Sequence, residues 1–183
     1  DSTTFTGGLD TTAASATNTA GTITTADTQM DLGAVTLAAD TTLDTGTAAT
    51  SVLNIGAVSS GGNALTLDAG GNAAAAITVA SFADNGDITI TDSGSTTFSG
   101  AVSAGTVTIT DTTGTVSFAG DTTIGTALAT TAEAYNVSFT GASNSVAGDT
   151  TFANTGTVTL GDGASDSTTF TGGLDTTAAS ATN

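Results

Sequence analysis

Carboxylates are the only side chains of this protein that carry a charge at neutral pH and could bind a metal ion or take part in acid–base chemistry. The chain has sixteen Asp and one Glu, and it has no Lys, Arg, His or Cys. In the segment GDGASD (Gly161–Asp166), Asp162 and Asp166 lie close together beside a glycine turn. Oxygen ligands of this kind suit calcium or magnesium. We therefore regard Asp162 and Asp166 as minor candidates for a loosely bound calcium ion, against the alternative that both are solvated turn residues.

Nucleophilic catalysis needs a base beside the nucleophile, and the many Ser and Thr residues have no His or Lys to serve as one. Pairs of carboxylates can hydrolyse glycosides, but basic and aromatic residues to grip a sugar are scarce here. Asp92, Asp111 and Asp162 each follow a similar strand-like run, a position typical of turn residues that bond to their own backbone. The sequence therefore predicts no catalytic residue, no cofactor and no enzymatic activity.

The formal net charge of −17 limits the partners of the chain. A chain without cations cannot neutralise phosphates, which excludes nucleic acid, and it is repelled by anionic lipid. The most apolar stretch, AAAAITVASFA (73–83), is too short to cross a bilayer, so we expect no membrane insertion in this segment. The expected partner is another copy of the same repeat.

An identical block, DSTTFTGGLDTTAASATN, stands at Asp1–Asn18 and again at Asp166–Asn183. Two unrelated domains would not keep every position matched, surface threonines included. The repetition indicates a tandem array in which a second copy begins at Asp166. Residues 1–165 then form one full repeat unit, and residues 166–183 begin the next.

Between the two blocks, hydrophobic residues alternate with Thr or Ser at a period of two. Runs such as DITITD (87–92), TVTIT (106–110) and NVSFTG (136–141) predict strands with one buried and one exposed side. No segment predicts an amphipathic helix. The best helical candidate, TALATTAEAY (126–135), is expected to be a loop or an insertion.

Shorter repeats lie inside the long one. Phe98, Phe118, Phe139 and Leu160 follow one another at a nearly constant interval of about 20 residues. A fixed period of this length predicts stacked turns that share one core. The expected fold is an all-β, right-handed β-solenoid (parallel β-helix) of about 20–24 residues per turn, with seven or eight turns in each unit; a string of β-sandwich domains is the competing architecture. The predicted core ladder consists of Ile90, Phe98, Ile109, Phe118, Phe139, Phe152, Leu160 and Phe170.

The T-x-T triplets of the chain include four that begin at Thr22, Thr89, Thr106 and Thr157. In a strand both threonines of a triplet point to the same side, so regular ranks of them could bind ice or a carbohydrate surface. The triplets are unevenly spaced along the chain, and Thr is in any case a common strand residue. The threonine array is therefore an alternative to a purely structural role.

Repeats such as TVTITDTTGTVSFAGDTT (106–123) resemble the β-strand repeats of large secreted bacterial proteins, namely filamentous-haemagglutinin-like adhesins and the passenger regions of autotransporters. The likeness covers most of the chain and lies in its composition and in the periodicity of its strand-like runs. It includes no diagnostic motif. It implies a parallel β-helix at the bacterial cell surface, in a stalk, an adhesin or a matrix fibre.

These observations predict a structural repeat module of a long secreted bacterial surface protein. Its turns would stack into a rigid extracellular filament, stalk, or adhesin or biofilm-matrix fibre. Two alternatives are the threonine-array binding face and a calcium-stabilised adhesin segment.

Overall fold

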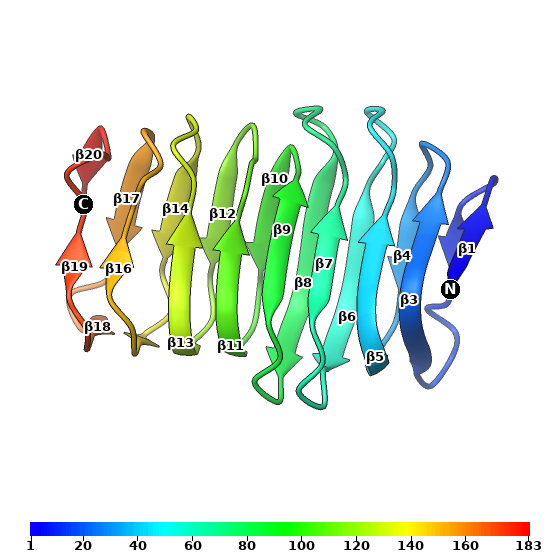
Figure 1. The fold of residues 1–183 in the computed structure, drawn as a ribbon, viewed down its shortest axis with the longest axis horizontal. Helices are drawn as coiled ribbons and strands as arrows, with labels where there is room; N and C mark the ends of the chain where they lie inside the picture. Colours follow the sequence, from blue (N-terminus) through cyan, green and yellow to red (C-terminus); the bar gives the residue numbers. More distant parts are fainter.

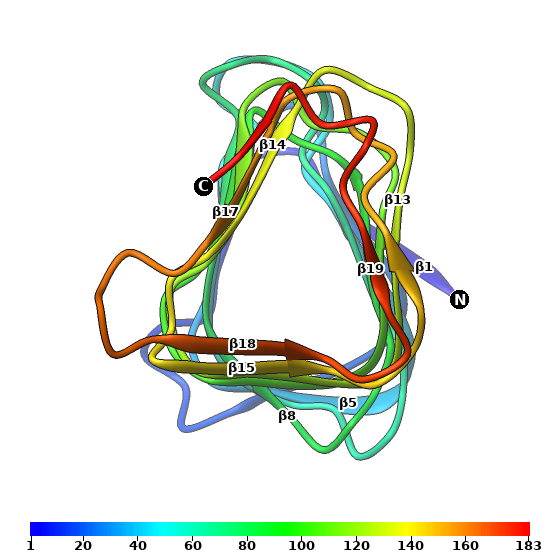
Figure 2. The same ribbon diagram turned by 90° about the vertical axis from the view of Figure 1, so that its left-hand side faces the viewer.

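The alternation of Thr or Ser with aliphatic residues produces strands along the whole chain. A computed structural model describes all residues 1–183 and contains twenty β-strands and no helix. The strands wind into a parallel β-solenoid of about nine turns with roughly 21 residues per turn. Viewed along its axis, the solenoid has a triangular cross-section (Figure 2). The predicted fold class is confirmed, and the competing string of sandwich domains is wrong.

Each turn contributes a strand segment to three flat faces, which we name A, B and C in chain order. Face A contains β1 (Ser2–Phe5), the second halves of β3 (Thr17–Thr25) and β5 (Val35–Asp44), β7 (Leu65–Asp68), β9 (Ile88–Asp92), the second halves of β11 (Val102–Ile109) and β13 (Thr122–Thr130), β16 (Thr150–Thr151) and β19 (Leu174–Asp175). Face B contains β2 (Leu9–Asp10), β4 (Met30–Leu32), the first halves of β6 (Leu53–Ser59) and β8 (Ala76–Ala83), β10 (Ser95–Phe98), β12 (Thr115–Phe118), β14 (Asn136–Phe139), β17 (Thr157–Leu160) and β20 (Ala181–Thr182). Face C contains the first halves of β3, β5, β11 and β13, the second halves of β6 and β8, β15 (Ser143–Val146) and β18 (Ser167–Phe170).

All pairings between successive turns are parallel and almost all are in register. On face A, for example, Leu43 lies opposite Leu67, and Leu67 lies opposite Ile90. In Figure 1 the front strands β3, β5, β7, β9, β11 and β13 all run upward, and each successive turn lies further to the left, toward the C-terminal end. This arrangement makes the solenoid right-handed, as predicted.

The interior is a single core of 32 buried hydrophobic residues that runs along the axis. On face B the aromatic rings of Phe98, Phe118 and Phe139 stack in successive turns, with ring centroids 5.1 and 4.7 Å apart. Leu160 continues this column and is partly buried. The predicted ladder residues therefore all contribute to the core, but not to one ladder.

The other members of that predicted set lie on different sides of the triangle. Ile90 and Ile109 are fully buried neighbours on face A. Phe152, just after β16, is also fully buried, and its ring meets that of Phe170 edge-on at 6.0 Å. Phe170 points inward from face C, where it lies opposite Val146. The interval of one turn thus links residues of a single face, whereas the remaining ladder residues belong to other faces.

Glycine two residues after each stacked phenylalanine lets the chain turn the corner from face B to face C. Gly100, Gly120 and Gly141 lie one above another there. A Cβ atom on Gly120 would lie 2.3 Å from the carbonyl carbon of Gly100, and one on Gly141 would lie 2.3 Å from the carbonyl oxygen of Gly120. The recurring sequence Phe-x-Gly therefore joins a core residue to a corner that has no space for a side chain.

Two further sequence expectations can be compared with the fold. The segment 126–135, expected to be a loop, begins with the last residues of β13, and only its second half is irregular. Since the chain forms no helix, it has none that could span a membrane.

Candidate functional site

The most regular surface feature is a column of threonines on face A. Thr22, Thr42, Thr66, Thr89 and Thr108 lie directly opposite one another on five successive turns. Each is partly exposed, and the hydrophobic residue that follows it points inward; these residues are Ile23, Leu43, Leu67, Ile90 and Ile109. Parallel strands place such neighbours about 4.8 Å apart, so the column presents a row of hydroxyl and methyl groups about 20 Å long.

The T-x-T triplets themselves do not form an unbroken double rank. Three of the four, those beginning at Thr22, Thr89 and Thr106, lie on face A, whereas the triplet at Thr157 lies on face B. In the two turns between Thr22 and Thr89, the second position of the triplet is occupied by Asp44 and Asp68. The single threonine column was missed in the sequence because Thr42 and Thr66 are followed by Leu-Asp rather than by a hydrophobic residue and Thr. The recurrence of T-L-D at both positions was the available signal.

These aspartates form a second column at the edge of face A. Asp44 lies opposite Asp68, and Asp68 lies opposite Asp92. Burial raises the pKa of Asp68; the backbone N–H of Gly70 opposes this rise, and the charges of Asp44 and Asp92 add to it. Burial also raises the pKa of Asp92, with a further contribution from the charge of Asp111. The column therefore carries repulsion between like charges that the fold does not neutralise.

The grouping of Asp92, Asp111 and Asp162 from the sequence is only partly correct. Asp92 ends β9 and Asp111 follows β11, both on face A, whereas Asp162 follows β17 on face B. The similar sequence motif thus occurs on two different faces. Asp162 is not a member of the aspartate column.

The calcium candidates Asp162 and Asp166 lie in one turn, where Asp166 acts as a cap. One oxygen of its carboxylate accepts hydrogen bonds from the backbone N–H groups of Asp162 and Gly163, at 2.9 and 2.7 Å. These two bonds lower the pKa of Asp166. No group of three or more acidic side chains in the chain is arranged to hold a metal ion. The calcium-stabilised alternative therefore has no acidic cluster to support it.

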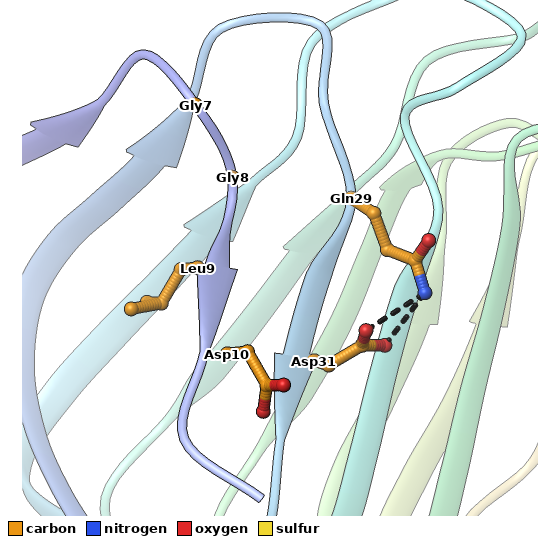
Figure 3. A pocket seen from close by; sticks show the side chains of 6 residues that line it. All are labelled: Gly7, Gly8, Leu9, Asp10, Gln29 and Asp31. Carbon is orange, nitrogen blue, oxygen red and sulfur yellow. Dashed lines mark hydrogen bonds between the residues drawn. The ribbon is translucent and has the colours of Figure 1, made fainter.

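A shallow hollow of about 300 Å³ lies beside the first two turns on face B (Figure 3). Its lining includes Asp10, Gln29 and Asp31. The side-chain amide of Gln29 donates to both oxygens of Asp31, at 2.9 and 2.8 Å, and Asn54 donates to one of them at 2.7 Å. The side-chain hydroxyl and the backbone N–H of Thr12 lower the pKa of Asp10. Hydrogen bonds within the protein thus already engage both carboxylates, and no nucleophile paired with a base lies in the hollow.

Comparisons of this chain with the models of protein families, with curated proteins and with solved structures give no match. The resemblance to secreted bacterial repeat proteins implied a parallel β-helix, and the structure confirms that fold alone. The regular features of the surface are columns of small polar residues and of carboxylates. The side chains of these columns can bind water, carry negative charge and form hydrogen bonds.

Proposed function

We propose that this chain is a structural module of an extracellular fibre, in which successive copies of residues 1–165 extend one rigid β-solenoid. The observation that carries the proposal is the unbroken parallel pairing from β1 to β20 around a core that runs along the axis. Such a core gains length with every copy, because each new turn buries the apolar side of the turn before it.

The polar surface fits this role. Each face has a central outward column of polar residues, most of them Thr or Ser. On face C, for example, Asn18, Thr36 and Ser59 lie opposite one another on successive turns. The acidic residues give a net charge of −17 that keeps neighbouring rods apart in solution. With no Lys or Arg, the chain offers no cleavage site to proteases that require a basic residue, an advantage outside a cell.

Small-angle X-ray scattering from proteins of one, two and three copies tests the proposal. Each added copy should lengthen the particle by about 37 Å, from about 4.8 Å per turn, with no change in the radius of the cross-section. A cross-section that thickens, or scattering typical of beads joined by flexible linkers, would contradict a continuous rod. Antibody labelling of intact producing cells tests the extracellular location, and label confined to permeabilised cells would oppose it.

The threonine column on face A favours a second candidate function, the binding of ice or of a carbohydrate surface. Thermal hysteresis and polysaccharide pull-down should then be positive for the chain and be reduced by Thr66→Lys in the middle of the column. Thr123→Lys on face C is the matched control. Activity that is absent, or equally reduced by both variants, would leave the column a purely structural feature.

A further inference from the structure

The core is less covered in the first turn of the solenoid than further along the axis. A hollow of about 310 Å³ opens there, lined by inward-pointing residues of the first turn that include Thr3, Phe5, Leu9 and Thr17. Phe5, Leu9 and Ile23 are only partly buried, whereas Leu43 and Leu67, further along face A, are fully buried. Residues of the first turn therefore bury less of their apolar surface than residues at matching positions further along the axis.

The structure shows what covers the same block of sequence elsewhere. At Asp166–Asn183 the identical block lies on the turn formed by residues 143–160: β18 pairs with β15, β19 with β16, and β20 with β17. Phe170, the counterpart of Phe5, lies opposite Val146 and packs edge-on against Phe152. The backbone N–H of Phe152 donates to the backbone carbonyl of Asp175 at 2.8 Å, and that of Thr171 donates to the backbone carbonyl of Val146 at 2.9 Å.

The two copies of the block lie on different faces. The first copy runs over faces A, B and C as β1, β2 and the start of β3, and the second copy runs over faces C, A and B as β18, β19 and β20. One period therefore spans eight turns less one face. Inward and outward positions are kept, since Phe170 packs against the core and its counterpart Phe5 lines the hollow of the first turn.

The three faces accept the same sequence. The tetrapeptide Ser-Thr-Thr-Phe forms β1 on face A, β10 on face B and β18 on face C. Strands that bend over a corner without a loop also occur at two corners, between faces C and A in β3 and between faces B and C in β6. A change of face thus conflicts with no local requirement of the sequence.

We propose that in a multi-copy chain residues 1–18 of each copy lie on the 143–160 turn of the copy before it, as residues 166–183 do here, and that successive copies are rotated by one third of a turn about the fibre axis. Three copies then make about 23 turns, or about 110 Å, before the same residue returns to the same face. The outward column on face C, which ends in Ser145 and Thr169, continues in the next copy as the column of Thr24 and Asp44. This inference rests on the proposed multi-copy rod and specifies how its copies join.

Engineered disulfides can test the junction, because the chain has no cysteine of its own. In the chain of residues 1–183, Ser145→Cys with Thr169→Cys should form a disulfide, and so should Thr151→Cys with Asp175→Cys, since both pairs lie directly opposite on adjacent strands. Thr151→Cys with Thr169→Cys is the pair that an unrotated junction would join. A disulfide in this last pair, with none in the first, would overturn the proposal.

A two-copy chain, residues 1–165 followed by the whole of residues 1–183, extends the test to the internal junction. Ser145→Cys of the first copy should cross-link to Thr4→Cys of the second, and in a separate variant Thr4→Cys should cross-link to Thr24→Cys within the second copy. Scattering that shows linear growth, together with failure of the first cross-link and formation of the Thr151–Thr4 cross-link, would reject the rotation and leave the rod intact. A particle that does not grow linearly would instead reject the proposed function.

Discussion

The rings of Phe118 and Phe139 stack face to face in successive turns, with centroids 4.7 Å apart and planes 9° apart. This distance equals the spacing of neighbouring strands, so the side chains in the core repeat with the same period as the backbone. Phe98 adds a third ring at 5.1 Å from Phe118. The middle ring is therefore packed on both sides.

We expect Phe118→Ala to lower the free energy of unfolding by about 3–5 kcal/mol, because it leaves a cavity between two rings that cannot close up. Chemical denaturation monitored by circular dichroism measures the loss. Ser117→Ala, on the outward side of the same strand, is the control and should change the stability by less than about 0.5 kcal/mol. Equal effects of the two variants would show that Phe118 is not in a packed ladder.

Gly120→Ala should also destabilise the solenoid, by about 1–3 kcal/mol, since its new methyl group would lie 2.3 Å from the carbonyl carbon of Gly100. Gly7→Ala is a matched control, because a Cβ atom there meets nothing within 4 Å. Thermal melting of both variants compares them. A Gly120→Ala protein as stable as the parent would mean that the corners are not stacked as closely as described.

The hydroxyl of Tyr135 joins two turns inside the solenoid. It donates to the carbonyl of Ile109 at 3.1 Å and accepts from the N–H of Thr131 at 2.9 Å, and the side chain is fully buried. Tyr135→Phe should cost about 1–3 kcal/mol, because it leaves two backbone groups without a partner. Hydrogen exchange of the Thr131 amide should accelerate in the same variant. Unchanged exchange would indicate that this amide does not depend on the hydroxyl.

The pH dependence of stability follows from the aspartate column. Because burial raises the pKa of Asp68 and Asp92 above 3.8, these groups bind protons more readily in the folded state. Stability should therefore fall as the pH rises through the range just above 3.8, and acidification from neutral pH should increase it. Below 3.8 the trend should reverse, because the lowered pKa of Asp10, Asp166 and Asp175 makes their protonation favour unfolding.

The variant Asp68→Asn should accordingly stabilise the protein at pH 7 by about 0.5 kcal/mol. It should also reduce the increase in stability that acidification from neutral pH produces. The asparagine can still accept the hydrogen bond that Gly70 now donates to Asp68 at 3.1 Å. Asp149→Asn removes one charge from an exposed site outside the column and serves as the control. Greater stabilisation by Asp149→Asn than by Asp68→Asn would show that net charge, not the column, governs the effect.

The alternation of period two and the nearly constant spacing of Phe98, Phe118 and Phe139 were sufficient to predict strands, stacking and the length of a turn. The assignment of residues to faces could not be predicted in this way, because it depends on the length of every corner passed. The corner between β5 and β6 is long, whereas only Ser93 and Gly94 separate β9 from β10. The even spacing of Leu43, Ile55 and Leu67, at about half a turn, consequently reflects alternate visits to faces A and B.

The same cause hid the two surface columns. Thr42 and Thr66 belong to the threonine column only because the turns before them bring them into register with Thr22 and Thr89. Asp162 was grouped with Asp92 by local similarity, but it lies on face B because the motif begins one face later. Local sequence thus determines whether a residue points inward or outward, and accumulated loop lengths determine its neighbour on the next turn.

Electron cryomicroscopy of long multi-copy filaments tests most directly whether one solenoid runs through successive copies. The expected power spectrum has a meridional reflection at about 4.8 Å and a second one from the axial rise of about 37 Å per copy, on filaments of constant width. Separate particles joined by linkers, with no reflection at the strand spacing, would contradict a continuous fibre. The binding of ice or carbohydrate by the threonine column would then be the function to test.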